Sequence, residues 1–354
     1  MRVLLIKTSS LGDVVHCLPA VSDMARHVSG LRLDWVIEEP FSEIARMHPA
    51  VERAVVVRLR SWRRRLHQAQ AWREFSAFRR LIVSRRYDLI IDAQGLIRSA
   101  LLARLACGPH CGYDAQSVRE PPASFLYDRK FAASVTIHAV ERIRRLVAQS
   151  VGYPLPAETG YGLDIVADRP SWLTADRHIV FAHATARPDK CWAARNWAEL
   201  AQRASAEGVA IVAPWGSELE RQRSAVLAAR VPGVITPPRL GFRELASLMA
   251  SATAVVGVDT GLTHLASAVG APVVAIYAAS WSEFNGAVGP AFVANLGGPG
   301  APPSVDDVWA QTQRAMAARG EIRSWRPIAA EPTPELSHRR RFRPSSARLD
   351  FQRR

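Results

Sequence analysis

A repeated alternation of short apolar runs with helix-length segments constrains the fold of this chain more than any other feature. The strand-length runs of the first half are Val3–Ile6, Leu33–Ile37, Ala54–Leu59 and Leu89–Asp92. Those of the second half are His178–His183, Val209–Pro214, Val234–Thr236, Ala254–Val258 and Pro272–Tyr277. Because strands that alternate with helices form parallel sheets covered on both faces, the pattern predicts an α/β fold.

A stretch rich in glycine and proline, Gly152–Pro170, separates the two halves. We therefore predict two doubly wound Rossmann-like domains, residues 1–160 and 171–325, that face a central cleft. Ligands of such sheets bind at the carboxyl ends of the strands, so both domains would present strand-end loops to this cleft. Residues 326–354 contain several prolines and many arginines without periodicity, which predicts a disordered basic tail.

The composition is that of a globular protein, with 48% hydrophobic and 22% charged residues. Its net charge of +14 indicates an anionic partner, which could be a nucleic acid, a membrane surface or an acidic substrate. The first apolar run is too short for a signal peptide, and no uncharged run reaches the ~18 residues of a membrane span. The four cysteines form no disulfide framework, so we expect a cytoplasmic protein.

The turn Asp259-Thr260-Gly261 connects a predicted strand to a predicted helix and is the strongest candidate site. Small residues there leave the first N–H groups of the helix open to a pyrophosphate, which the helix dipole also favours. Asp259 could accept hydrogen bonds from ribose or sugar hydroxyls, or from the amides of the turn. The alternative is that Asp259 and Thr260 only cap the helix. His264 could donate to a phosphate, or it could be a surface or core histidine.

Two further strand-end loops of the second half carry polar side chains suited to a nucleotide. Thr185 and Lys190 follow one strand and could hold phosphate oxygens, although a single lysine is most often a solvated surface residue. Glu220 follows another strand and could accept from ribose hydroxyls, or it could favour a helix N-terminus. Three loops that meet at one edge of a sheet indicate a nucleotide site.

The loop KTSSLGDVVH follows the first strand and leads into a predicted helix over Val14–His27. It lacks the glycine pattern of a phosphate loop, and its one carboxylate, Asp13, would repel a phosphate. Asp13 could be a helix N-cap or a general base facing the cleft. His16 lies at i+3, where it could orient Asp13 or simply be packed or exposed. We expect Lys7, Ser9 and Ser10 to shape the acceptor side of the cleft.

An arginine-rich segment, Arg58–Arg86, holds ten arginines and a single acidic residue, Glu74, with two tryptophans between them. Arginine matches phosphates and carboxylates bidentately, so the segment predicts a polyanion site or a membrane-facing surface. A solvated charged face is the alternative, and Arg119 is a weaker candidate for the same role. CGPHC at residues 107–111 offers too few ligands for zinc, and no acidic pair suited to Mg²⁺ is present. We therefore expect no metal.

The combined motifs resemble those of the lipopolysaccharide heptosyltransferase I family, within glycosyltransferase family nine, from Met1 to about Trp325. The matching segments are MRVLLIKTSSLGDVVHCLPAVSDM, LDWVIEEPFSEIARMHPAVERAVVV, DLIIDAQGLIRSALLARLA, AHATARPDKCW, APWGSELER and VDTGLTHLASAVGAPVVAIY. The resemblance implies a GT-B fold and inverting, metal-independent transfer of heptose from ADP-L-glycero-D-manno-heptose. The implied acceptor is the first Kdo of Kdo2-lipid A, at the cytoplasmic face of the inner membrane.

The resemblance also implies residue roles, with Asp13 as the catalytic base. The implied donor contacts are Thr185, Lys190, Glu220, Leu240 (through its backbone), Asp259, Thr260, Gly261 and His264. Ala186 stands where the family pattern has a second threonine, so one hydroxyl contact worth about 1 kcal/mol is absent. The implied acceptor contacts are Arg58, Arg60, Arg63, Arg64 and Arg119. Two alternatives stay open: heptosyltransferase II, which uses a heptosylated acceptor, and, more distantly, a nucleic-acid-binding protein, although we expect no nucleic-acid partner.

Overall fold

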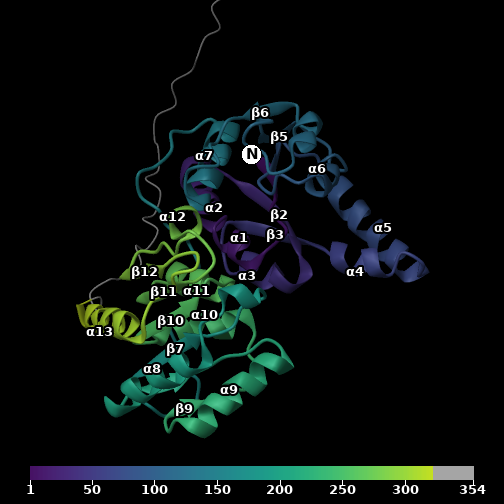
Figure 1. The fold of residues 1–354 in the computed structure, drawn as a ribbon. Coiled ribbons are helices and arrows are strands. Elements are labelled where there is room, and N and C mark those ends of the chain that lie inside the picture. Colours follow the sequence, from purple (N-terminus) through teal and green to yellow (C-terminus); the bar gives the residue numbers. More distant parts are fainter. Residues whose placement is uncertain (322–354) are drawn as a thin grey trace, which may run out of the picture. The chain divides into compact units, whose positions relative to one another are not determined.

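The computed structural model describes residues 1–321, which contain two six-stranded parallel sheets (Figure 1). The first sheet has the order β3-β2-β1-β4-β5-β6. Its strands are β1 (Arg2–Ile6), β2 (Arg32–Glu38), β3 (Val51–Val57), β4 (Leu89–Asp92), β5 (His110–Tyr113) and β6 (Arg129–Phe131). The central strand β1 pairs on both sides, with Leu5 opposite Trp35 of β2 and Ile91 of β4.

The second sheet repeats this design with the order β12-β11-β10-β7-β8-β9. Its strands are β7 (His178–Ala182), β8 (Ala210–Val212), β9 (Val234–Ile235), β10 (Ala254–Val258), β11 (Val273–Tyr277) and β12 (Val293–Gly297). Strand β10 lies between β7 and β11, so the loop after β10 leaves the sheet near its middle.

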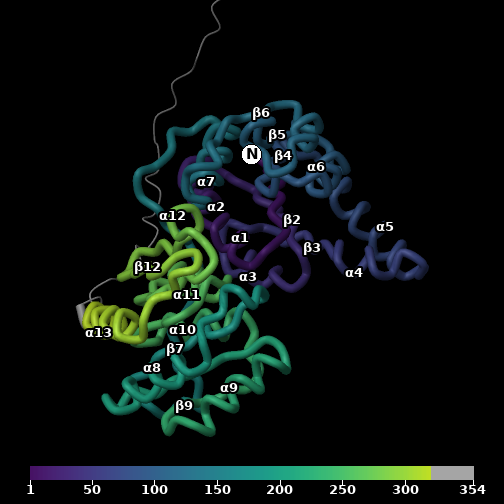
Figure 2. The backbone as a smooth tube through the Cα atoms, in the orientation of Figure 1, coloured from purple at the N-terminus to yellow at the C-terminus, as the bar shows by residue number. Residues whose placement is uncertain are grey.

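Helices connect the parallel strands, as crossover connections require. Those of the first half are α1 (Leu11–Val15), α2 (Leu18–His27), α3 (Ser42–Arg46), α4 (Leu59–Arg64), α5 (Ala69–Val83), α6 (Ile97–Ala103) and α7 (Ala139–Val151). Those of the second half are α8 (Ala194–Ala206), α9 (Glu218–Arg230), α10 (Phe242–Ser251), α11 (Gly261–Ala268), α12 (Ser282–Asn285) and α13 (Val305–Glu321). Figure 2 shows the backbone leaving β3 for α4 and α5 at the side of the first sheet.

Each sheet is buried on both faces, which explains its nearly continuous apolar strands. In β1, Val3 and Leu5 belong to one core and Leu4 and Ile6 to the other, as the two-residue period of a strand dictates. The first of these cores also contains Ala246, Leu265 and Ala268, which come from α10 and α11 of the second half. Packing of these helices against the first half holds the two sets of strand-end loops together.

The structure confirms the α/β architecture and corrects several boundaries. The predicted strand Ala54–Leu59 is displaced, because β3 ends at Val57 and Leu59 already begins α4. The predicted helix Val14–His27 is two helices, since α2 starts again at Leu18 with Pro19 in its first turn. The domain limits 1–160 and 171–325 stay a prediction, and the tail 326–354 lies outside the described residues. None of the helices within residues 1–321 combines the length and apolar character that a membrane span requires.

Candidate active site

Helix α1 of the first half lies against helix α11 of the second, where the loops after β1 and β10 meet (Figure 1). A Cβ atom at Gly261 would overlap the side chain of Leu11, so this close approach requires glycine. One turn further along α11, the Cδ2 atom of His264 would lie 3.1 Å from a Cβ atom at Gly12 of α1. Small residues on both helices therefore bring the Asp13 loop within reach of the Asp259 turn.

Asp13 occupies the third position of α1, and the N-cap is Ser10, so the prediction of Asp13 as an N-cap is wrong. Its carboxylate accepts from the backbone N–H and the hydroxyl of Ser10, at 2.8 and 3.0 Å, and lies 3.3 Å from the ammonium of Lys7. Burial raises the pKa of Asp13, but Lys7 and the two bonds from Ser10 outweigh burial and lower the pKa to about 2. Asp13 is therefore anionic and remains 33% exposed.

The loop around Asp13 is held by Lys7, which was predicted as an acceptor-side residue, and by Gln94, which sequence reasoning missed. Lys7 is only 5% exposed and donates to the Ala93 carbonyl at 3.2 Å. The side-chain oxygen of Gln94 accepts from the N–H groups of Thr8 and Ser9, at 3.0 and 3.3 Å. Of the three residues predicted to shape the acceptor side, Lys7 and Ser9 are buried and only Ser10 is exposed. Gln94 follows the end of β4, at the same sheet edge as the Asp13 loop. This position in the sequence is the signal that could have identified Gln94 as a candidate.

Asp259, directly after the end of β10, is the second carboxylate of the site and, unlike Asp13, is buried. Its Oδ2 accepts from Lys190 Nζ at 2.6 Å and from the hydroxyl of Ser280, and its Oδ1 lies 3.8 Å from His264 Nε2. Burial raises the pKa of Asp259, but contacts with these three groups outweigh burial and hold the pKa well below its usual range. Ser280 was not predicted, although its place beyond the end of β11 puts it at the same edge.

The N-terminus of α11 is open to an anion. Thr260 is the N-cap but makes no capping bond with its side chain, and the Asp259 carboxylate bonds elsewhere. The alternative that these residues only cap the helix is therefore wrong. Within residues 1–321, no protein group accepts from the N–H groups of Gly261 and Leu262. These two partly exposed amides, at the positive end of the helix dipole, can bind a phosphate.

The other predicted donor residues lie on neighbouring loops of the second half. Thr185 and Ala186 follow β7 and are partly to fully exposed, and Lys190 ends a short 3-10 turn, Pro188–Lys190. The carboxylate of Glu220 accepts from the N–H of Gly216 at 2.7 Å, so it caps α9 in this structure. The structure places the Leu240 side chain against a core of the second sheet.

The predicted acceptor arginines divide into paired and unpaired groups. Arg58 lies 2.5 Å from Glu39 and 3.7 Å from Glu74, so its charge is balanced within the protein. In the described part of the chain, no carboxylate lies within ion-pair distance of the other four predicted arginines, which are all exposed: Arg60, Arg63, Arg64 and Arg119. Trp72 of α5 is also 57% exposed, whereas Trp62 is buried and donates to Glu74.

His16 does not orient Asp13 by a hydrogen bond but meets His264 across the two halves. The Nε2 atom of His16 lies 3.2 Å from the Nδ1 atom of His264, and both side chains are buried. Burial, with His264 and His138 nearby, lowers the pKa of His16 well below its ordinary value, so the ring is neutral.

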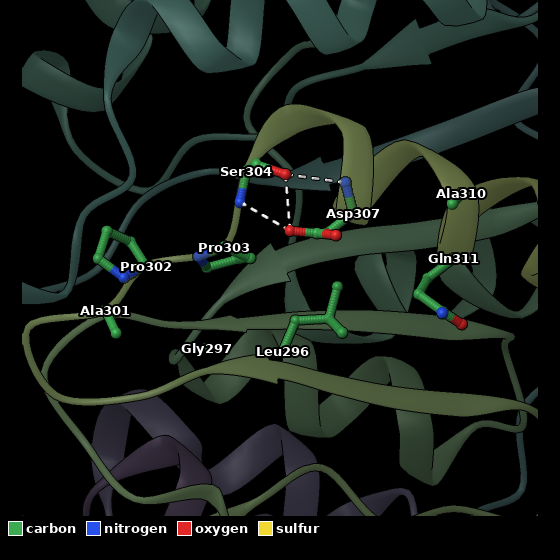
Figure 3. Close-up of a pocket in the computed structure, with 9 residues that line it drawn as sticks. All are labelled: Leu296, Gly297, Ala301, Pro302, Pro303, Ser304, Asp307, Ala310 and Gln311. Carbon is green, nitrogen blue, oxygen red and sulfur yellow. Dashed lines mark hydrogen bonds between the residues drawn. The ribbon is translucent and has the colours of Figure 1, made fainter.

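Two cavities in the described part of the chain are lined by none of the predicted site residues. A cavity of about 410 Å³ lies where β12 ends and α13 begins, with Ser304 and Asp307 bonded to each other at its wall (Figure 3). Another, of about 320 Å³, lies between α8 and α9. No cluster of three or more His, Cys, Asp or Glu residues arranged to bind a metal occurs in residues 1–321.

Two six-stranded parallel α/β sheets whose strand-end loops meet at an open helix N-terminus are the arrangement typical of GT-B glycosyltransferases. The model of glycosyltransferase family 9 (heptosyltransferase) matches residues 75–307, and the chain belongs to this family. It is 45% identical over 294 residues to lipopolysaccharide heptosyltransferase 1 of Pseudomonas aeruginosa, covering 82% of each chain. The corresponding protein of Escherichia coli K12 is 42% identical over 281 residues, which are 78% of this chain and 88% of that protein. These matches confirm the predicted resemblance.

Solved structures support the same fold. The E. coli heptosyltransferase WaaC with ADP superposes with a TM-score of 0.83 at 38% identity, over 89% of this chain and 100% of that chain. The E. coli ADP-heptose heptosyltransferase II gives a TM-score of 0.71 at 19% identity, over 90% of this chain and 99% of that chain, and shares the fold. The predicted GT-B fold is therefore confirmed.

The site predicts that Lys7 keeps Asp13 ionised. Replacement of Lys7 by Met leaves burial unopposed by that charge, so the pKa of Asp13 should rise from about 2 toward or above its ordinary value of 3.8. A folded-state pKa below the unfolded value stabilises the native state above about pH 4, and this contribution is lost as the pH falls toward 2. Carboxyl ¹³C titration of Asp13 measures the pKa, with exposed Lys130→Met as the control. Titration near 2 in Lys7→Met would contradict the assignment.

Proposed function

We propose that the chain is an inverting heptosyltransferase of lipopolysaccharide inner-core synthesis. It transfers heptose from ADP-L-glycero-D-manno-heptose to the first Kdo of Kdo2-lipid A. The observation that carries this proposal is the placement of an ionised carboxylate, Asp13, beside an open helix N-terminus on the opposite half. The names of the relatives support the reaction, and solved structures of WaaC hold ADP and ADP-2-deoxy-2-fluoro heptose. In this proposal residues 1–160 bind the acceptor and residues 171–325 bind the donor.

The donor diphosphate lies at the N-terminus of α11 in this proposal. The N–H groups of Gly261 and Leu262 donate to phosphate oxygens, and Thr260 and Thr185 can add hydroxyl donors. Lys190 already neutralises Asp259, so that lysine and carboxylate together add little net charge, and the helix dipole supplies the attraction. Asp259 then accepts from a hydroxyl of the sugar. Ala186 contributes only its backbone.

The adenosine half of the donor extends over the loops after β8 and β9. Glu220 accepts from the ribose hydroxyls. Its carboxylate already accepts from the N–H of Gly216, so the carboxylate must accept from the ribose hydroxyls in addition to this N–H group. The backbone at Leu240 meets the adenine, since the Leu240 side chain packs inward. His264 supports Asp259 from inside the protein.

The chemical step is a single displacement. Asp13 removes the proton of a Kdo hydroxyl while that oxygen bonds to the anomeric carbon and the bond from this carbon to the ADP oxygen breaks. One base and no enzyme nucleophile give inversion. A carboxylate with a pKa of about 2 is a weak base, but the hydroxyl becomes strongly acidic as its oxygen bonds to an oxocarbenium-like carbon. Lys7 guarantees that Asp13 is ionised when the acceptor arrives.

We propose that the leaving ADP needs no metal. Lys190 and the first amides of α11 lie where negative charge develops on the leaving phosphate. The described residues offer no cluster of metal ligands beside these groups.

We propose that the acceptor and an anionic membrane surface contact α4 and α5. Arg60, Arg63 and Arg64 are exposed on this segment without acidic partners in the described residues, and Arg119 lies on a separate exposed loop. Exposed Trp72 on α5 suits the interface of a bilayer. The protein would act as a peripheral protein at the cytoplasmic face of the inner membrane.

A transfer assay with two acceptors tests the function. We expect heptose transfer from ADP-heptose to Kdo2-lipid A, with an unchanged rate in excess EDTA. Preference for heptosyl-Kdo2-lipid A would instead assign heptosyltransferase II, and loss of activity in EDTA that Mg²⁺ restores would refute metal independence. Salt-sensitive binding to nucleic acid without any transfer would favour a nucleic-acid-binding protein.

The base is tested by Asp13→Asn, which keeps the shape and removes the proton acceptor. We expect kcat to fall at least about a hundredfold, because general-base assistance contributes about 10²–10⁴-fold. ADP affinity, measured by calorimetry, should stay within about twofold, since the donor side is untouched. Asp176→Asn, an exposed surface change, is the control. Normal turnover in Asp13→Asn would remove it from the mechanism.

The acceptor surface is tested by the double variant Arg63→Gln/Arg64→Gln. A charged hydrogen bond is worth about 1.5–3 kcal/mol, so the KM for Kdo2-lipid A should rise about tenfold or more, while the KM for ADP-heptose stays constant. The matched control is Arg230→Gln/Arg314→Gln, which removes the same charge from exposed positions of α9 and α13 in the second half. Equal effects of the two double variants would show that net charge alone matters.

A further inference from the structure

The contact between His16 and His264 joins the helix that carries Asp13 to the helix that follows Asp259. Nitrogen atoms 3.2 Å apart in two imidazoles form a hydrogen bond only when one of them carries the hydrogen and the other does not. Both rings are at least 95% buried, so water does not replace this bond. The tautomer of one histidine therefore determines that of the other.

The other side of His264 decides which nitrogen carries the hydrogen. Its Nε2 faces Oδ1 of the ionised Asp259 at 3.8 Å, longer than a direct hydrogen bond but close enough for strong attraction. A lone pair on Nε2 would be repelled there, so Nε2 carries the hydrogen. Nδ1 of His264 is then an acceptor, and His16 must donate to it through its own Nε2.

Among the residues that the structure describes, His16 is the group that lies within hydrogen-bond distance of Nδ1 of His264. His138 is the third histidine nearby, with its ring centre 5.7 Å from that of His16. Its Nε2 bonds to the Gly286 carbonyl at 3.0 Å, and its Nδ1 accepts from the N–H of Val140 at 3.2 Å. Both nitrogen atoms of His138 are therefore occupied. The His264 ring is also wedged against Gly12, which limits its rotation.

We propose that His16 is a positioning residue for the donor site. Its Nε2–H holds His264 in one tautomer and orientation, and His264 in turn orients Asp259, whose other oxygen holds Lys190 and Ser280. His16 need not touch the donor. This inference rests on the proposed function for the role of Lys190 and Asp259 in donor binding. In this proposal the donor site is complete only when α1 of the acceptor half packs against α11.

Two substitutions separate the donated hydrogen bond from packing. His16→Phe keeps a ring and loses the donor, whereas His16→Gln places an amide N–H near the position of Nε2. We expect ADP affinity, measured by calorimetry, to fall about fivefold in His16→Phe and to stay within about twofold of the wild type in His16→Gln. The KM for the acceptor should stay constant in both. Equal affinities in all three proteins, or equal losses in both variants, would overturn the proposal.

His48→Gln is the matched control. His48 is also buried in the first half and also bonds through Nε2, to the hydroxyl of Ser22 at 2.9 Å. We expect this variant to lose stability without losing ADP affinity. A loss of affinity as large as that of His16→Phe would show a general effect of packing and would contradict a specific role.

The tautomer can be read in the wild-type protein, whatever the variants do to folding. Two-bond ¹H–¹⁵N spectra of the ¹⁵N-histidine-labelled full chain should show a hydrogen-bearing Nε2 and a bare Nδ1 for His264. The opposite tautomer would overturn the proposal. Neither the spectrum nor the measurement of ADP binding requires heptose transfer. If the expected tautomer and the expected ADP affinities are found but no heptose is transferred, the proposed function is contradicted and the role of His16 is not.

Discussion

The close approach of α1 and α11 is the constraint on which the rest of the site depends. It exists because residues 12 and 261 have no side chain, so Leu11 can lie over Gly261 and the His264 ring beside Gly12. Apolar residues of α10 and α11 join the core beneath the first sheet, which stabilises this arrangement from below. A bulkier residue at position 261 would separate Asp13 from the open N-terminus of α11, which the proposed reaction requires side by side.

The same electrostatic arrangement, a lysine paired with a carboxylate, occurs twice at this junction. The chain has only three lysines among 46 basic residues, and two of them pair with the two carboxylates of the site, Lys7 with Asp13 and Lys190 with Asp259. Each carboxylate is largely buried, a condition that alone favours the neutral acid. Each lysine reverses that preference. The site thereby holds two anions close to the proposed diphosphate position without a large net negative charge, and in that proposal the open amides of α11 supply the attraction.

The sequence predicted the central strands well because they are apolar runs bounded by turns, and β4 and β10 match their predicted limits. It missed the edge strands β6 and β12, where burial is weaker, and the buried four-residue strand β5, whose sequence HCGY is not an apolar run. Asp13 and Asp259 could be predicted as candidates because each follows a predicted strand at its carboxyl end, whereas Lys190 was a weak candidate by itself. Gln94 and Ser280 also follow strands, but a neutral side chain does not show which charged group it will meet until the chain folds, and the contact between His16 and His264 was not predicted for the same reason.

Local composition thus determined by itself the alternating strands and helices and the strand-end positions of the candidate site, because those features depend on residues near each other in the chain. Tertiary structure decided which charges are free. Arg58 is paired while Arg63 has no ion-pair partner in the described residues, Lys7 adds its charge to the bonds that Asp13 accepts from the N-cap of its own helix, and His16 contacts a residue 248 positions away. The physical reason is that pairing and desolvation depend on distances in space, which a linear pattern of residues does not contain.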